Sequence, residues 1–392
     1  MARLMISIAI VLAISQPASA APCDGLTNPI YAQVGDTQAN LMKRLGRALR
    51  DNTAKPITLV WITSGSCVNI EVAYRPTKIA AGTSMQYVES VAENGTWTPA
   101  TANKTCEAPA GGVDVNVANS ALFNSECTAE TPPTNVALTL GPVQAYVLAV
   151  PKASNQTAIT FEEAYFVFGF GAAGMVEPWI NEAQMFIRTI SKSTLLAWAA
   201  NIGVPKDKWK GVRLDGSPMV VSSLQTSTSP QQAIGILGAE VYESLRDSLF
   251  QLAFRAKGQH AAYFPDSTYT ARDKKNVRDG HYTVWSPTVW MDQVSGGTPI
   301  KPDARYVIDL IAGKTVTPAH NFDMISVISN VGLIPDCAMN VKRSKEGGDL
   351  SIYKPAESCV CKYESIVSTS SCQTCTTTCA TGVCRNGFCE VQ

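Results

Sequence analysis

Charged residues and histidines are scarce in this chain of 392 residues. Charged side chains make up 16% of it, and only three histidines occur. The 32 basic and 32 acidic residues balance, so nothing in the charge favours a nucleic-acid partner. Neither an HExxH zinc motif nor a GxSxG nucleophile motif is present. We therefore expect a binding protein that has no catalytic residue, no cofactor and no metal.

Long apolar runs are also lacking, except near the start of the chain. Residues Met1–Ala20 combine the basic Arg3, an apolar run from Leu4 to Ile14 and the small residues Ala18–Ala20. This pattern is typical of a signal peptide that is cleaved before Ala21. No later stretch reaches the roughly 18 apolar residues of a membrane span. We expect a soluble mature protein that is periplasmic, secreted or held at the cell surface.

Cysteine, in contrast, is abundant. The twelve cysteines are an even number behind a signal peptide, which predicts structural disulfides in an oxidising compartment. Seven of them follow one another from Cys359 onward, where large aliphatic residues are few. Such a segment cannot form an apolar core, so we expect disulfides to hold it, with zinc as the alternative for the clustered cysteines. This tail, residues 337–392, serves either as an attachment module or as a protease-resistant cap.

Strand-like and helix-like segments alternate in the first part of the sequence. Pro29–Val34 and Ile57–Ile62 have the β-rich composition of short strands, and Gln38–Arg50 has the apolar spacing of an amphipathic helix. This order predicts an α/β fold. Further along, Ser193–Ile202 is a predicted helix, and the spacing of apolar residues predicts a long helix over Glu240–Ala256.

Three turns connect a predicted strand to a predicted helix through small hydroxyl residues. They are Gly35–Thr37, Thr63–Ser66 and Ser191–Thr194, and Arg188 precedes the third. A helix N-terminus has free N–H groups and a partial positive charge, so it can hold an oxyanion with few cations. Ser and Thr are also ordinary N-cap residues, so each turn taken alone has a purely structural explanation.

The order of elements and several sequence blocks resemble the phosphate-type substrate-binding proteins of ABC importers, in particular the cysteine-containing exported branch. The resemblance covers roughly Asn28 to Leu333 and rests on blocks taken together: Asp114–Asn119, Arg188 with Lys192–Thr194, Ala233–Leu237 and Val277–Tyr282. It implies a two-lobed type II periplasmic-binding-protein fold, to which the cysteine-rich disulfide tail is appended.

The resemblance also implies boundaries and a site. Lobe 1 comprises residues 21–142 and 286–336, and lobe 2 comprises residues 143–285. An anion is expected between helix N-termini of both lobes, near these residues: Asp36, Thr37, Thr63, Ser64, Gly65, Ser66, Asn119, Arg188, Ser191, Ser193 and Thr194.

Two departures from the family pattern leave the ligand open. Asn119 stands where the family has an aspartate, and an amide does not select protonated phosphate in the way that a carboxylate does. Asp36 is either its replacement or a plain N-cap residue. Lys192–Thr194 replaces a Ser-Gly-Thr turn and lacks its glycine.

Two functions follow from the sequence. The first is a monomeric receptor that binds phosphate or a similar oxyanion and presents it to an ABC importer permease. The alternative is a surface or matrix interaction protein that keeps the binding fold, has lost transport and uses its tail for attachment.

Overall fold

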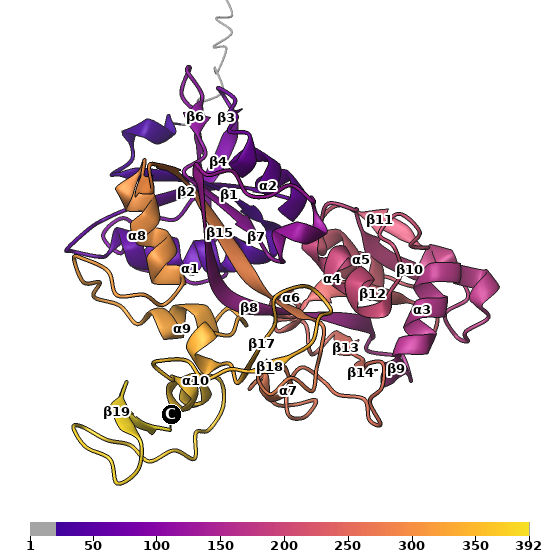
Figure 1. The fold of residues 1–392 in the computed structure, drawn as a ribbon. Coiled ribbons are helices and arrows are strands. Elements are labelled where there is room, and N and C mark those ends of the chain that lie inside the picture. Colours follow the sequence, from indigo (N-terminus) through magenta and orange to yellow (C-terminus); the bar gives the residue numbers. More distant parts are fainter. Residues whose placement is uncertain (1–20, 392) are drawn as a thin grey trace, which may run out of the picture.

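The computed structural model describes residues 21–391, so the predicted signal peptide at Met1–Ala20 lies outside the described residues. Lobe 1 alternates strands and helices as predicted (Figure 1). Its elements before the crossover are β1 (Pro29–Gly35), α1 (Ala39–Arg50), β2 (Thr58–Ser64), α2 (Ser66–Tyr74), β3 (Lys78–Ile79), β4 (Ser84–Tyr87), β5 (Lys104–Glu107), β6 (Val113–Asp114) and β7 (Val117–Ser120).

The chain then crosses to lobe 2 through β8 (Val136–Pro151) and returns through β15 (Trp285–Ser295). Lobe 2 contains the following elements: β9 (Ala158–Thr160), α3 (Phe161–Phe170), β10 (Met185–Arg188), α4 (Ser193–Ile202), β11 (Val212–Leu214), α5 (Ser217–Gln225), β12 (Ile234–Gly238), α6 (Ala239–Tyr242), β13 (Leu249–Gln251), β14 (Ala253–Arg255) and α7 (Lys275–Arg278).

After the return, β16 (Thr298–Pro299), α8 (Pro302–Ile311) and α9 (Met324–Ser329) complete lobe 1. The tail carries β17 (Val341–Lys342), β18 (Ser351–Ile352), α10 (Val360–Val367), β19 (Val383–Arg385) and β20 (Phe388–Glu390). Every helix among residues 21–391 is too short or too polar to cross a lipid bilayer.

One path of paired strands runs through both lobes, in the order β11-β10-β12-β8-β15-β7-β1-β2-β4-β5. The strands β8 and β15 lie at its centre, where they pair antiparallel between the two lobes (Figure 1). β15 contributes Trp285 to the core of lobe 2 and Trp290 to the core of lobe 1. Burial of both indoles anchors this crossover strand at each end.

The local chemistry explains several element ends. Thr160 caps α3 by accepting from the Glu163 N–H, and the Glu163 side chain accepts from the Thr160 N–H in return. Gly203 ends α4 with φ +70, a left-handed conformation that favours glycine. The predicted helix over Ser193–Ile202 is therefore confirmed.

The predicted long helix over Glu240–Ala256 is wrong. α6 ends at Tyr242, and the chain continues as β13 and β14. Leu249 and Leu252 are buried in the lobe 2 core, and β13 pairs with the end of β8. Edge pairing with β8 therefore outweighs the helical spacing of the apolar residues.

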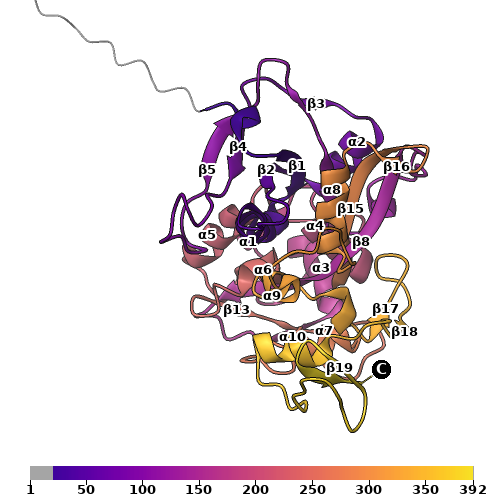
Figure 2. The same ribbon diagram turned by 90° about the vertical axis from the view of Figure 1, so that its left-hand side faces the viewer.

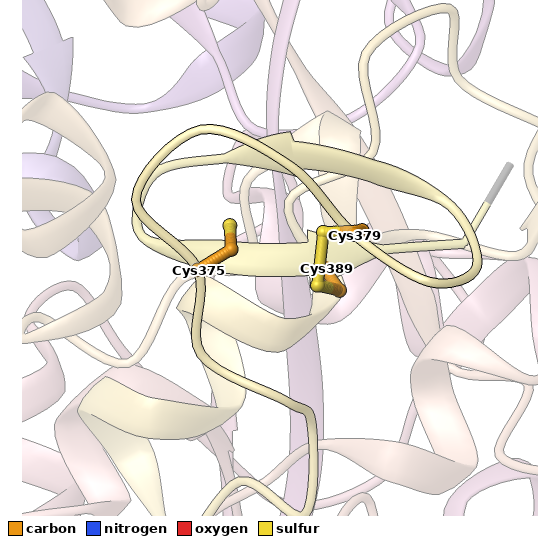
Figure 3. Close-up of side chains that lie close together, drawn as sticks. All are labelled: Cys375, Cys379 and Cys389. Carbon is orange, nitrogen blue, oxygen red and sulfur yellow. A yellow bond between two sulfur atoms is a disulfide. The ribbon is translucent and has the colours of Figure 1, made fainter.

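All twelve cysteines lie among the described residues and all form disulfides, as the sequence predicts. Cys67 pairs with Cys127 within lobe 1. In the tail, Cys375, Cys379 and Cys389 lie within 4.8 Å of one another by their sulfur atoms (Figure 3). Zinc ligation requires thiolates, and these sulfurs are bound to other sulfurs. The remaining pairs are Cys23–Cys106, Cys337–Cys359, Cys361–Cys372, Cys375–Cys384 and Cys379–Cys389.

The tail is fastened to both lobes (Figures 1 and 2). Tyr363 of α10 is buried in the lobe 2 core, and Glu364 accepts from Arg278 of lobe 2 at 3.0 Å. Lys362 on the same helix lies 2.9 Å from Asp323 at the start of α9 in lobe 1. α10 therefore bridges the boundary between the lobes.

Candidate functional site

The predicted turns of the two lobes meet at the carboxyl ends of the parallel strands, where ligands bind in open α/β sheets. Gly65 follows β2 and packs on Ser191, which follows β10. A Cβ atom added to Gly65 would lie 2.8 Å from the Ser191 hydroxyl oxygen and 2.9 Å from its carbonyl oxygen. The Cys67 N–H, at the start of α2, donates to that carbonyl at 3.2 Å. A backbone oxygen of lobe 2 thus caps a helix of lobe 1, at a position suited to an anion.

Arg188 ends β10 and is completely buried. Its Nε donates to the Leu214 carbonyl at 3.3 Å, and its Nη1 donates to the Ser217 hydroxyl at 2.7 Å. Its Nη2 donates to the Asp215 carbonyl at 2.6 Å and to the Asp36 carboxylate at 2.8 Å. A buried guanidinium requires a negative partner, and here that partner is Asp36 of lobe 1.

The carboxylate of Asp36 reaches from the turn after β1 into lobe 2. Its Oδ2 accepts from Arg188 and from the Ser217 hydroxyl and N–H, at 3.0 and 3.1 Å. Ser217 is the first residue of α5, so the carboxylate sits at a helix N-terminus. Burial would raise the pKa of Asp36, but Arg188, the Ser217 N–H and Lys192 together hold it below its ordinary value. The ionised carboxylate of Asp36 is therefore itself the anion that Arg188 and the N-terminus of α5 bind.

The third turn, Ser191–Thr194, forms the N-terminus of α4, where some of the polar groups already have partners and others do not. Lys192 is buried and its Nζ lies 3.3 Å from Asp215 Oδ1, an ion pair within lobe 2. The Thr194 hydroxyl is buried and has no hydrogen-bond partner among the described residues. Burial raises the pKa of Tyr146 well above its usual value, and a hydrogen bond from the neighbouring Ser193 opposes this. Tyr146 itself donates to the carbonyl of Ala121 in lobe 1.

Other predicted site residues have partners within lobe 1. Asn119 Oδ1 accepts from the Gly35 N–H at 3.5 Å, and its Nδ2 donates to the carbonyls of Ser120 and Val289. The Ser66 hydroxyl accepts from the Ala121 N–H at 3.2 Å. Both side chains thus tie adjacent segments of lobe 1 together.

The remaining hydroxyls of the two lobe 1 turns differ in exposure. Thr63 is exposed and Ser64 is half-buried. The Thr37 hydroxyl is buried and has no partner within residues 21–391. Of these three, Thr37 alone is a buried group that still lacks a hydrogen bond.

Sequence reasoning missed two parts of this region. The first is Ser217, although the run Asp215–Pro218 has the turn residues and the early proline of a helix start. The second is a buried amide pair, in which Gln38 Nε2 donates to Gln144 Oε1 on β8. The other amide atom of each glutamine is unpaired among the described residues, and no local motif marks such a pair.

A separate recess opens beside this region. It has a volume of about 570 Å³ and lies between α1, α6, α9 and α10. Lys43 and Arg44 of lobe 1 and Arg272 of lobe 2 line it, together with Glu240 and with Glu243, which pairs with Arg272 at 3.9 Å. Burial lowers the pKa of Arg44, and its guanidinium has no hydrogen bond or ion pair within the described part of the chain. Within this recess, Arg44 is therefore the group at which an anion could bind.

Comparison with solved structures identifies the architecture. A protein from Clostridium perfringens, described as a phosphate ABC transporter substrate-binding protein with bound phosphate, matches with a TM-score of 0.51. The match covers 79% of this chain and 99% of that one, at 13% identity. The fold is that of a periplasmic binding protein. At this identity the similarity establishes the fold alone.

Other solved structures match less well. An ABC-type phosphate transport receptor from Vibrio cholerae has a TM-score of 0.48 and 12% identity, over 79% of this chain and 100% of that one. A phosphate-binding protein from Stenotrophomonas maltophilia has a TM-score of 0.44 and 12% identity, over 79% and 91%. Neither a family model nor a curated protein sequence matches this chain.

Proposed function

We propose that this protein is an extracytoplasmic solute-binding protein that takes a phosphate-like oxyanion between its lobes and presents it to an ABC importer. The observation that carries the proposal is the set of hydrogen bonds that lobe 2 donates to Asp36. A buried guanidinium, a hydroxyl and a helix N–H from lobe 2 converge on one carboxylate of lobe 1. Donors that hold a carboxylate can also hold an oxyanion of phosphate or sulfate.

Binding in this scheme is an exchange of anions. The lobes separate about β8 and β15, Asp36 leaves Arg188, and a solute oxygen takes its place against Arg188 and Ser217. The unpaired Thr194 hydroxyl and the start of α4 supply further donors on lobe 2. Because Asp36 is tethered, it competes at a high effective concentration, of the order of millimolar or more. The apparent affinity for the solute is lowered accordingly.

The twelve disulfide-bonded cysteines support an oxidising, extracytoplasmic location. Arg188 and Ser217 hold a carboxylate of lobe 1 in place, and this arrangement supports the binding of an anion. We propose a monomer, and the importer remains a partner class inferred from the fold.

A second candidate function is a non-transport interaction protein at the cell surface. Two observations favour it: Asp36 already occupies the lobe 2 donors, and the Ser191 carbonyl already occupies the Cys67 N–H. Under this alternative the closed form is the working form, and the tail provides attachment.

Calorimetry on the mature protein, residues 21–392, distinguishes the two functions. Inorganic phosphate, sulfate and glycerol 3-phosphate are titrated into the natural protein, Arg188→Ala and Arg44→Ala. Binding that Arg188→Ala abolishes and Arg44→Ala leaves intact supports the receptor. No heat from any of the three anions, in a protein whose disulfides are formed, argues for the alternative. Binding lost only in Arg44→Ala would move the site to the recess.

A further inference from the structure

A hairpin of the tail lies across the boundary between the lobes. Its arms, β17 and β18, pair antiparallel. The hairpin packs against Gly280 of lobe 2, whose added Cβ would lie 3.3 Å from Val341 of β17 and 2.7 Å from Leu350, which precedes β18. The loop between the arms contains residues 343–350. This arrangement brings a tail segment to the crossover strands (Figure 1).

Arg343 anchors the loop on the crossover strand β15. Its guanidinium stacks over the Trp285 ring at 4.0 Å. Its Nη2 donates to the Thr283 carbonyl at 2.7 Å and also to the Trp285 carbonyl. Arg343 is 8% exposed, so this anchor is shielded from solvent and from salt.

The next residues of the loop touch both lobes. Glu346 is 6% exposed, and its Oε1 accepts from the Phe123 N–H of lobe 1 at 3.3 Å. Gly347, with φ +59, lies against α4 of lobe 2, where an added Cβ would be 3.0 Å from the Ala200 carbonyl. Two consecutive residues therefore contact opposite lobes.

We propose that residues 343–348 form a latch, which crosses the closed crevice and must detach before the lobes can separate to admit a solute. The proposal rests on the proposed function, since it assumes a crevice that opens. It assigns a role to a tail segment that lies beyond the region resembling substrate-binding proteins. Opening would require the loop to release one of the lobes, and in the proposed latch it is the Phe123 N–H that loses its acceptor.

Buried charge makes this latch sensitive to pH. Burial raises the pKa of Glu346 to about 7, and its Oε2 has no partner among the described residues. The groups that face it are Arg343 on its own loop, Ser286 on β15, the Phe123 N–H and Glu126, and Tyr146 on β8. Arg343 favours ionisation, but burial and Glu126 oppose it.

The sign follows from this raised pKa. A detached, exposed glutamate has a pKa of about 4.3, so the latched form binds the proton more tightly than the detached form does. Between pH 5 and 7, each pH unit lowers the ratio of latched to detached molecules by up to about tenfold. The latch is closed in mildly acidic solution and weakens toward neutral pH.

Hydrogen exchange of the Phe123 amide, without any solute, tests the latch. Rates corrected for intrinsic exchange are compared at pH 5 and pH 7 in the full mature protein. We expect the natural protein to lose protection by up to about a hundredfold between them. Glu346→Gln keeps the neutral form and should stay protected at both values. Glu346→Ala should exchange fast at both.

The matched control is Asp349→Asn, an exposed acid in the same loop, which should behave like the natural protein. A Glu346→Ala variant as well protected as the natural protein at pH 5 would overturn the latch, and equal protection at both pH values in the natural protein would overturn its sensitivity to pH. Since no anion is present, this result is independent of the calorimetry. Anion binding with no latch would leave the proposed function standing.

Discussion

The substitution Asp36→Asn removes one negative charge from the contact between the lobes and keeps the shape of the side chain. Arg188 would remain buried with three neutral acceptors: the carbonyls of Leu214 and Asp215 and the Ser217 hydroxyl. Removing one partner of a fully buried ion pair costs about 3–5 kcal/mol. The Asp36 side chain is 22% exposed, so solvent screens part of this, and we expect a loss of about 2–3 kcal/mol.

Urea unfolding at pH 7 measures this loss as a lower midpoint at an unchanged slope. Asp215→Asn is the matched control, because that carboxylate faces Lys192 but its side chain is 77% exposed. It should change the free energy of unfolding by less than about 1 kcal/mol. An Asp36→Asn protein as stable as the natural one would refute the view that this carboxylate is the anion of the site.

An added anion should restore part of the lost stability. If phosphate or sulfate takes the place of the carboxylate, the variant gains about 2.7 kcal/mol when the anion is present at a hundred times its dissociation constant. The natural protein should gain less at the same concentration, because Asp36 competes. Equal gains in both proteins would indicate that the anion binds elsewhere, for instance at Arg44.

The remaining predictions concern the response of the Asp36 ion pair to acid, the packing at Gly65 and the Cys67–Cys127 disulfide. Acid titration should destabilise the natural protein more than its Asp36→Asn variant. The ion pair contributes to the free energy of unfolding above about pH 4, and this contribution is lost as pH falls through the lowered pKa of Asp36. The free energies of unfolding of the two proteins, measured in urea, should therefore converge at low pH. Gly65→Ala should cost about 1–3 kcal/mol by overpacking against the Ser191 backbone, whereas Gly25→Ala, which has open space, should be neutral; a neutral Gly65→Ala would mean that the lobes separate freely. Replacing Cys67 and Cys127 together by Ala should cost about 4 kcal/mol of stability through loop entropy and leave anion heats unchanged; abolished heats in a folded double variant would give this disulfide a role in the site.

The repeating units of lobe 1 could be predicted because each carries its own local signal. Leu41, Leu45 and Leu49 follow the helical period and are all buried on one face of α1. The strands on either side consist of short apolar runs, and β1 and β2 pair in parallel as this order requires. A helical pattern of period 3.6 between two such runs is compatible with few structures other than a strand–helix–strand unit.

The segment after β12 shows where such patterns fail. Its apolar residues follow a helical spacing from Val241 to Leu252, yet most of the segment is not helical. The open edge beside the end of β8 offers β13 a set of backbone hydrogen bonds. That edge belongs to a strand about a hundred residues earlier, so no local window of sequence contains the information.

Residue pairs that join the two lobes cannot be predicted from the sequence for the same reason. Arg188 and Asp36 each appeared among the predicted site residues, yet they are 152 positions apart and nothing in the sequence pairs them. Both were expected to face a solute. Glu346 lies in a loop without any motif, so its position between the lobes follows only from the hairpin that carries it.

Several kinds of contact stabilise the closed form of the protein. Their free energies determine the apparent affinity with which a solute can bind. Each 1.4 kcal/mol that favours the closed, solute-free form lowers the apparent affinity tenfold. A pair worth about 2–3 kcal/mol at Asp36 would lower it by roughly 30- to 150-fold. The ratio of phosphate affinities of the Asp36→Asn variant and the natural protein therefore measures the strength of this internal anion. A ratio near one, in a protein that binds phosphate through Arg188, would mean that Asp36 moves aside without cost.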